Sequence, residues 1–201
     1  MNRLILILPI LLSACATSRM DSLQLSQVDR PYNRVLVLYY NEDAEIKNLD
    51  ETTYTEIIQP SMNSLRERRY VDQLNRVMQR NLSSKGTVIV KSNEVFQVEE
   101  EVSYQDFQET ILDNNLDAVL IVNNYHYWTT VNVIEGYSFD NQNAAFDTYL
   151  YDLERDKFVW RSNVVVNGGE LAGYEIINGK LASRIARDLR KYQYIHPADV
   201  R

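Results

Sequence analysis

The side chains able to do acid–base or metal chemistry are few and scattered in this sequence. His126 and His196 are the only histidines, and neither lies near an HExxH motif, a paired CxxC motif or an EF-hand loop. A metal needs several ligands held at a fixed spacing, which those motifs supply. The acidic run of Glu99, Glu100 and Glu101 could bind a cation, but such a run between a strand and a helix is usually a solvated loop. We therefore expect no metal and no cofactor.

Two catalytic patterns are also missing from the sequence. A phosphate-binding loop needs G-x-x-x-x-G-K-[ST], but five residues separate Gly173 from Gly179, and Leu181 replaces the hydroxyl. No G-x-S-x-G motif is present for a serine hydrolase. Carboxylate pairs such as Asp113 with Asp117 are present, so the sequence alone does not exclude a glycosidase. We predict that the protein is not an enzyme, with a cell-wall glycan or peptide hydrolase as the alternative.

The single thiol, Cys15, follows an apolar run at the start of the chain. Arg3 precedes Leu4–Leu12, interrupted by Pro9, as in the charged and apolar regions of a signal peptide. The run is too short to span a bilayer, which takes roughly 20 apolar residues. Leu-Ser-Ala-Cys at 12–15 resembles the bacterial lipobox.

That resemblance implies a lipid anchor. It implies removal of a signal peptide at 1–14, a diacylglyceryl group on the Cys15 sulfur, and an added acyl chain, such as palmitate, on its amino group. Several acyl chains, at about 0.8 kcal/mol per buried methylene, hold a protein stably. Ala16 rather than aspartate follows Cys15. In the enterobacterial version of the family, this implies the outer membrane of a Gram-negative bacterium and the periplasmic face.

The charge of the mature chain argues against some partners. Loss of 1–14 removes Arg3 from 21 basic residues and leaves 20 against 28 acidic ones, a formal charge of −8. Nucleic acid and an anionic membrane surface are therefore not expected as charge-driven partners. The length suits one domain, which must be stabilised by its core because no second cysteine exists for a disulfide.

The hydrophobic pattern predicts an α/β fold in a single domain. Polar residues 15–33 are predicted to be a lipid-anchored flexible tether that spans roughly 20–25 Å, followed by a domain at 34–195 and a solvated tail at 196–201. The expected domain begins with a buried strand at 34–40, a long loop at 41–60 with at most a short turn of helix, and a helix from 61 to about 85. A strand at 87–96, a helix opened by a capping box at 103–106, and a strand at 117–122 that 125–133 extends or follows come next. After a break at 136–143, the pattern predicts a hairpin of 146–153 and 157–166 and a helix at 174–192. The order β-α-β-α-β, antiparallel hairpin, C-terminal α predicts a mixed sheet of about five strands covered by helices.

Two short stretches carry a family resemblance. NLDAVLIV at 115–122 looks like the "ADAVLVG" strand of TolB amino-terminal and CsgG-like α/β domains, and DLERDKFVW at 152–160 looks like their D-x-x-x-G-x-V-W hairpin. This chain lacks the hairpin glycine and has Asp156 or Lys157 nearby. The resemblance implies a non-catalytic domain that docks partners or assembles in the cell envelope.

The stretch Tyr125-His126-Tyr127-Trp128 is the candidate binding site. Strand alternation predicts Tyr125, Tyr127, Thr129, Val131 and Val133 on one face, and His126, Trp128, Thr130 and Asn132 on the other. An exposed face would offer aromatic and hydrogen-bonding groups to a protein or a sugar ring. The alternative is a sheet covered on both faces, in which His126 is simply packed.

Together these patterns predict an outer-membrane lipoprotein that acts as a binding or assembly module. Its expected partner is an envelope protein or peptidoglycan, and its oligomeric state is left open. A further alternative is a component of an oligomeric secretion pore, which needs two long amphipathic hairpins. Only residues 125–133 approach that requirement.

Overall fold

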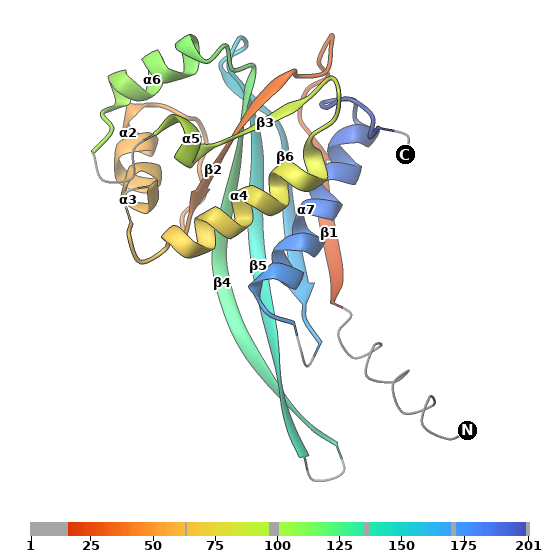
Figure 1. Ribbon diagram of the computed structural model, residues 1–201. Helices are drawn as coiled ribbons and strands as arrows, with labels where there is room; N and C mark the ends of the chain where they lie inside the picture. The colour runs from red at the N-terminus through yellow and green to blue at the C-terminus, as the bar shows by residue number, and fades with distance from the viewer. Residues whose placement is uncertain (1–15, 63, 97–100, 135–136, 170–171, 200–201) are drawn as a thin grey trace.

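The protein forms one α/β domain around a six-stranded mixed sheet (Figure 1). The computed structural model describes residues 16–62, 64–96, 101–134, 137–169 and 172–199. The predicted signal peptide at 1–14, the lipidation site Cys15, and Glu99 and Glu100 lie outside the described residues. The sheet order is β1-β6-β5-β4-β2-β3. The strands are β1 (Thr17–Gln24), β2 (Arg34–Tyr40), β3 (Val88–Lys91), β4 (Ala118–Ile134), β5 (Tyr137–Asp152) and β6 (Lys157–Asn167).

The centre of the sheet comes from the strongest apolar runs in the sequence. β2 pairs in parallel with both β3 and β4, while the other neighbours are antiparallel. Strands buried on both faces need apolar residues at every position, and β2 has them from Val35 to Tyr40. Alternate residues therefore enter two cores, with Val35 and Val37 on one face and Leu36 and Leu38 on the other. The mixed sheet and single domain confirm the predicted fold class.

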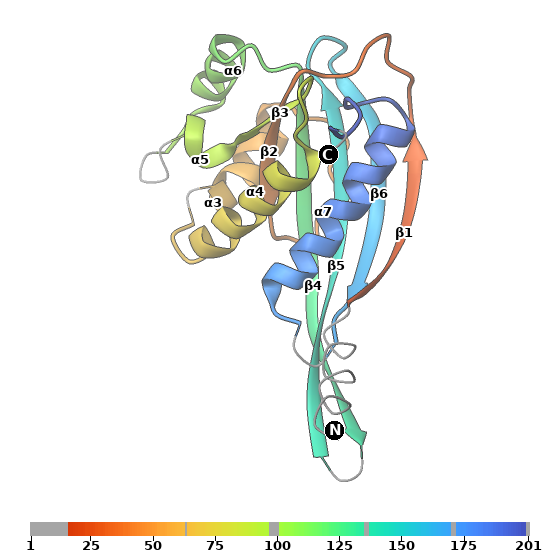
Figure 2. The ribbon, with the colours of Figure 1, turned by 45° about the vertical axis from the view of Figure 1, so that its right-hand side comes forward.

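Helices cover both faces of the sheet. α4 (Arg68–Leu82) and α7 (Tyr174–Lys191) lie side by side on one face, as Figures 1 and 2 show. Leu181, Ile185 and Leu189 recur at four-residue steps along α7 and are fully buried there. The opposite face of β2 and β4 is packed by shorter helices: η1 (Tyr54–Ile58), α3 (Gln59–Met62), α5 (Ser92–Val95) and α6 (Tyr104–Asp113). A further turn of helix, α2 (Glu51–Thr53), precedes η1 and buries no side chain. Among the described residues, none of the helices combines the length and apolar character needed to cross a membrane.

Several predicted boundaries were wrong. The long loop expected at 41–60, with at most a short turn of helix, is helical from residue 51, and the helix expected from residue 61 has its main length, α4, from Arg68. The strand expected at 87–96 ends at Lys91, where Glu94 accepts a hydrogen bond from the backbone N–H of Lys91 and starts α5. The expected break at 136–143 is also wrong, because β5 begins at Tyr137. Pairing with β4 outweighs the low strand propensity of asparagine there.

Two local turn predictions were confirmed. The Ser103 hydroxyl accepts the backbone N–H of Asp106 and caps α6. Residues 153–156 connect β5 to β6, and Asp156 has a φ of 51°, the left-handed conformation for which glycine is the usual residue. Aspartate tolerates that conformation better than most residues.

The predicted flexible tether at 15–33 is wrong where its first part forms a strand. Thr17–Gln24 form β1, an edge strand paired antiparallel with β6 from Thr17↔Asn167 to Gln24↔Trp160. Met20 packs against the core, and Arg184 of α7 donates hydrogen bonds to the Ser18 hydroxyl (2.7 Å) and carbonyl (3.0 Å). Only Ala16 lies between Cys15 and Thr17 in the sequence, so an anchor on Cys15 would be attached close to the start of β1.

Candidate functional site

The β4–β5 hairpin continues well beyond the rest of the sheet (Figure 1). β4 has 17 residues and β5 has 16, whereas β6 ends at Asn167, opposite Asn143 of β5. Beyond the Trp128↔Asn143 pair, the two strands form a ribbon with no third strand beside it in the described residues. We call residues 129–133 and 138–142 the hairpin arm.

A β-bulge in β4 sets the direction of the aromatic side chains at the base of the arm. Asn123 pairs with Asp147, but His126 pairs with Ala145, so β4 has one extra residue between them. The Tyr125 hydroxyl consequently accepts a hydrogen bond from Asn163 (3.0 Å) on the sheet face turned away from α7. The expectation that Tyr125 shares a face with Tyr127 was therefore wrong. Alternation holds again from His126 onward.

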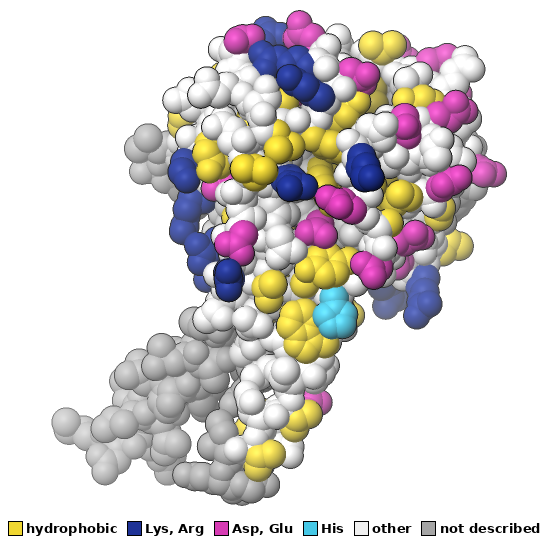
Figure 3. Space-filling model, turned by 180° about the vertical axis from the view of Figure 1, so that it is seen from behind, with side chains coloured by type: hydrophobic (Ala, Val, Ile, Leu, Met, Phe, Trp, Pro, Cys, Tyr) yellow, Lys and Arg dark blue, Asp and Glu magenta, His cyan; other side chains and the backbone are white. Residues whose placement is uncertain are grey.

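Tyr125, His126 and Trp128 form an aromatic patch on that face. The His126 and Trp128 rings stack with centroids 4.9 Å apart and an interplanar angle of 20°. His126 is exposed, while Tyr125 and Trp128 are half-buried. Figure 3, seen from behind, shows a histidine among hydrophobic side chains where the hairpin leaves the body. The helices on this face pack against β2 and the first residues of β4, and no residue of the aromatic patch belongs to that core. The patch is therefore accessible to a partner.

Tyr127 lies on the opposite face and packs the base of the hairpin against α7. Its ring stacks on Tyr174 at 5.0 Å, and Tyr174 meets Tyr70 of α4 edge-on at 5.4 Å. Burial, and next the neighbouring Tyr174, raise the pKa of Tyr127 to about 12. Tyr127 is therefore a packing residue, and the candidate site reduces to the other three aromatic residues.

The arm itself exposes apolar side chains. Val131 and Val133 are 61% and 67% exposed. They share the α7 face of the ribbon, and Thr130 and Asn132 point to the other. Among the ten arm residues, Asp140 alone is charged. The alternation of valine with polar residues in TVNV was visible in the sequence, but nothing there showed that both faces would be uncovered.

The carboxyl group of Asp147 lies half-buried on the patch side of the sheet. It accepts a hydrogen bond from Asn163 (2.9 Å), which also bonds Tyr125. Burial raises the pKa of Asp147 above its ordinary value, and the nearby carboxylates of Glu45 and Asp43 add to that rise. The Asn163 hydrogen bond opposes it. Through Asn163, the Asp147 carboxyl group thus helps to fix the position of the Tyr125 hydroxyl.

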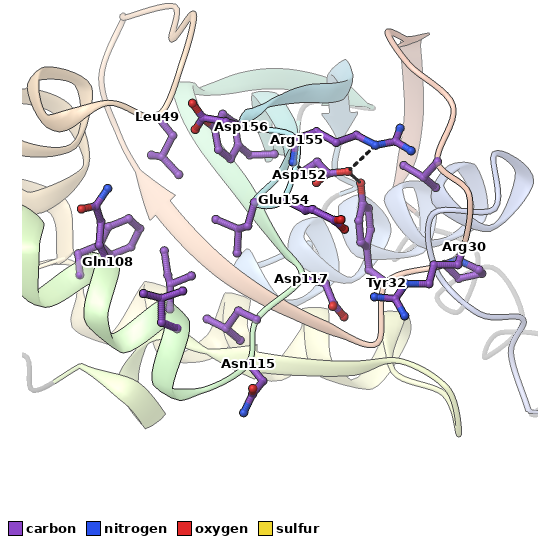
Figure 4. A pocket seen from close by; sticks show the side chains of 18 of the residues that line it. Arg30, Tyr32, Leu49, Gln108, Asn115, Asp117, Asp152, Glu154, Arg155 and Asp156 are labelled. Carbon is purple, nitrogen blue, oxygen red and sulfur yellow. Dashed lines mark hydrogen bonds and ion pairs between the residues drawn. The ribbon is translucent and has the colours of Figure 1, made fainter.

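A cleft of about 930 Å³ lies at the other end of the sheet, between α6, the β5–β6 turn and residues 28–32 (Figure 4). It gathers carboxylates, as the hydrolase alternative predicts, and Asp152 and Asp117 among them accept hydrogen bonds from neighbouring groups. Asp152 accepts the Tyr32 hydroxyl (2.8 Å) and the backbone N–H of Arg155 (2.9 Å). Asp117 accepts two backbone N–H groups of residues 33 and 34. His126 is far from this cleft, on the hairpin at the opposite end.

The remaining chemical candidates lie apart from both places. His196, expected in a solvated tail, is half-buried, and its ring would lie 2.4 Å from a Cβ added at Gly86. Its backbone N–H donates to Thr87 (3.0 Å), so this part of the tail is packed. Across the described residues, no three His, Cys, Asp or Glu side chains are grouped so that they could hold a metal ion.

The fold and site define a single-domain α/β protein with a mixed sheet and a projecting hairpin. No protein-family model and no curated protein matches the sequence. Among solved structures, it is similar to the PelC dodecamer from Paraburkholderia phytofirmans, with a TM-score of 0.49, 10% identity, and coverage of 84% of this chain and 95% of that one.

Two lipoproteins are also similar in fold. The lipoprotein GNA1162 from Neisseria meningitidis has a TM-score of 0.41 and 14% identity, covering 79% of this chain and 99% of that one. A minor lipoprotein from Acinetobacter baumannii has a TM-score of 0.35 and 9% identity, covering 80% and 94%. With TM-scores below 0.5, these likenesses establish neither a family nor a function for the chain. The resemblance to TolB amino-terminal and CsgG-like domains stays a prediction.

Proposed function

We propose that the protein is a non-catalytic binding or assembly module, anchored by lipid on Cys15 to the periplasmic face of the outer membrane. The observation that carries the proposal is the hairpin arm, a two-stranded ribbon with exposed Val131 and Val133. An isolated two-stranded ribbon is marginally stable in water at best. An exposed apolar surface of this kind marks a site of contact with another protein or with a membrane.

The aromatic patch supplies the chemistry for specific contact. Tryptophan and tyrosine are enriched among the residues that dominate binding energy, because each buries a large area and loses few rotamers. The stacked His126–Trp128 pair is pre-organised, so little ordering remains to be done on binding. These groups suit an envelope protein. Peptidoglycan is the alternative ligand, since an indole ring can also pack on a sugar.

The position of β1 limits where that partner is found. Because β1 begins two residues after Cys15, the anchor leaves the domain little freedom to move away from the bilayer. Thr17 and Trp128 lie at the same level of the sheet, through the pairs Thr17↔Asn167, Asn143↔Asn167 and Trp128↔Asn143. A tethered patch at this level has a high effective concentration towards membrane-proximal surfaces, so a weak interface is sufficient.

Site-specific crosslinking in intact cells tests the proposal. A photo-reactive amino acid replaces Trp128, and a matched variant carries it at Leu112, which is 74% exposed on α6 at the far end of the domain. We expect a discrete crosslinked envelope protein from position 128, none from position 112, and loss of the product in Cys15→Ser. Identical products from both positions would refute the docking surface. Crosslinking that persists unchanged in Cys15→Ser would refute the role of the anchor.

A further inference from the structure

We infer that the hairpin arm enters the polar interface of the membrane that holds the lipid anchor, with Val133 at its deepest described point. The inference rests on the proposed lipidation of Cys15. It starts from the corrected fold: β1 begins at the level where the hairpin leaves the body, as Figures 1 and 2 both show. The chain that carries the lipid and the arm thus leave the domain at the same end.

The relative reach of the two segments follows from chain dimensions. From Cys15 to Thr17 is a step of two residues, which spans at most about 7 Å whatever its conformation. From Trp128 to Val133 is a step of five residues in a paired strand, or about 16 Å at roughly 3.3 Å per residue. Thr17 and Trp128 share one level, so Val133 lies about 9 Å beyond the furthest level that Cys15 reaches.

That excess matches the thickness of the interface. The polar region on each side of a bilayer is roughly 5–8 Å deep outside a hydrocarbon core of about 30 Å. With the glyceryl group of Cys15 in this region, Val133 arrives at the edge of the hydrocarbon when the strands stand along the membrane normal. Tilting the strands by about 45° shortens the step of about 16 Å to roughly 11 Å, so the excess falls to roughly 4 Å and Val133 stays within the interface.

The side chains of the arm fit this position. Val131 and Val133 present an apolar stripe, and Thr130 and Asn132 offer groups that hydrogen-bond to lipid head groups. Among the ten arm residues, the one charge, Asp140, pairs with Val131, two residues back from Val133, where it stays at the level of the head groups. Glu135, two residues after Val133 in the sequence, lies outside the described residues. No lysine or arginine occurs among the arm residues, so the contact is by insertion rather than by attraction to anionic lipid.

An environment-sensitive probe on the intact lipoprotein tests this inference. Lipidated protein is reconstituted into vesicles of phosphatidylethanolamine and phosphatidylglycerol, and a nitrobenzoxadiazole dye is attached to Val133→Cys. Cys15 as a thioether does not react with the dye, which leaves a single labelling site. Leu112→Cys is the control at the far end of the domain. Both substituted positions are exposed, so neither change is expected to disturb folding.

We expect the dye at position 133 to emit at shorter wavelength and to lose most of its intensity to spin-labelled lipid. The dye at position 112 should show neither effect. Emission at position 133 equal to that at 112, in protein that floats with the vesicles, would overturn the inference while the anchor stands. A blue shift that depends on protein concentration and resists spin-labelled lipid would assign the arm to a second copy, and would also overturn it. A Cys15 thiol that reacts with the dye would instead overturn the anchor, and both proposals with it.

Discussion

Replacement of Arg184 by alanine is expected to release β1 from the sheet. The Arg184 guanidinium, on α7, donates from Nε to the Ser18 hydroxyl at 2.7 Å and from Nη2 to the Ser18 carbonyl at 3.0 Å. These bonds reach from a helix of the core to a strand that lies at the edge and pairs on one side with β6. Their loss leaves β1 held chiefly by its backbone ladder.

The expected magnitude follows from the number and exposure of these bonds. A hydrogen bond to a charged group contributes about 1.5–3 kcal/mol when it is well shielded from water. Arg184 is half-buried, so solvent screening reduces each contribution to about 1 kcal/mol, or about 2 kcal/mol for both. Since 1.4 kcal/mol corresponds to a factor of ten, the population with β1 detached should rise by about 30-fold.

Limited trypsin digestion measures that population directly. The Arg19 side chain is 81% exposed, so pairing of the strand, rather than burial of the side chain, protects the peptide bond that follows. When opening and closing are fast, the cleavage rate follows the population of the open state. We expect cleavage after Arg19 to be about 30-fold faster in Arg184→Ala. The matched variant Arg187→Ala, which removes an exposed arginine three residues further along α7, should behave as wild type.

Two results would refute this reasoning. Equal rates of cleavage in wild type and Arg184→Ala would show that the guanidinium does not hold β1. Cleavage of the wild type as fast as of an unstructured peptide with the sequence of residues 16–24 would show that these residues do not form a strand in solution. The second result would restore the flexible tether that the sequence predicts, and would remove the geometric basis for placing the arm in the interface.

Three other substitutions test the packing that supports the site. Burial raises the pKa of Asp147 in the fold, so its ionised form destabilises the protein above that pKa. Asp147→Asn should therefore raise the melting temperature at pH 7, and this advantage should vanish as the pH falls below the unfolded value of about 4. Trp160 is fully buried and donates from Nε1 to Asp188 (2.8 Å), so Trp160→Phe should cost about 1–3 kcal/mol in urea denaturation. Tyr70→Phe removes the hydroxyl that donates to the buried Asn178 (3.0 Å), and should cost about 1–3 kcal/mol in the same assay.

The parts of the fold that the sequence predicts well are those where burial dictates residue type. β2 and the first residues of β4 are covered on both faces, and a strand in that position requires a continuous apolar run. The α7 helix buries one stripe and therefore shows a period of three to four residues from Tyr174 onward. In both cases, the pattern is a direct consequence of the environment.

The parts that the sequence misses depend on backbone pairing. β1 is an edge strand whose residues alternate between exposed and half-buried, and its bonding partner is the free edge of β6. The backbone groups that pair two strands do not depend on side-chain type. Polar side chains such as Arg19 and Asp21 therefore leave no hydrophobic pattern from which the strand could be predicted. The bulge before His126 is hidden for the same reason. It changed the candidate site, because it moved Tyr125 to the face of His126 and Trp128.

The two missed features also bear on how the sheet would separate the proposed binding patch from the proposed anchor. The bulge turns Tyr125 away from the core, while Tyr127 is kept against α7 as a fixed base for the ribbon. β1, through its pairing with β6, fixes the height of that base relative to Cys15. A long tether would allow the patch to sample surfaces throughout the periplasm. With the proposed lipid on Cys15, a link of two residues would restrict the patch to partners at the membrane, so the selectivity of such a module would depend on its distance from the bilayer as well as on contact chemistry.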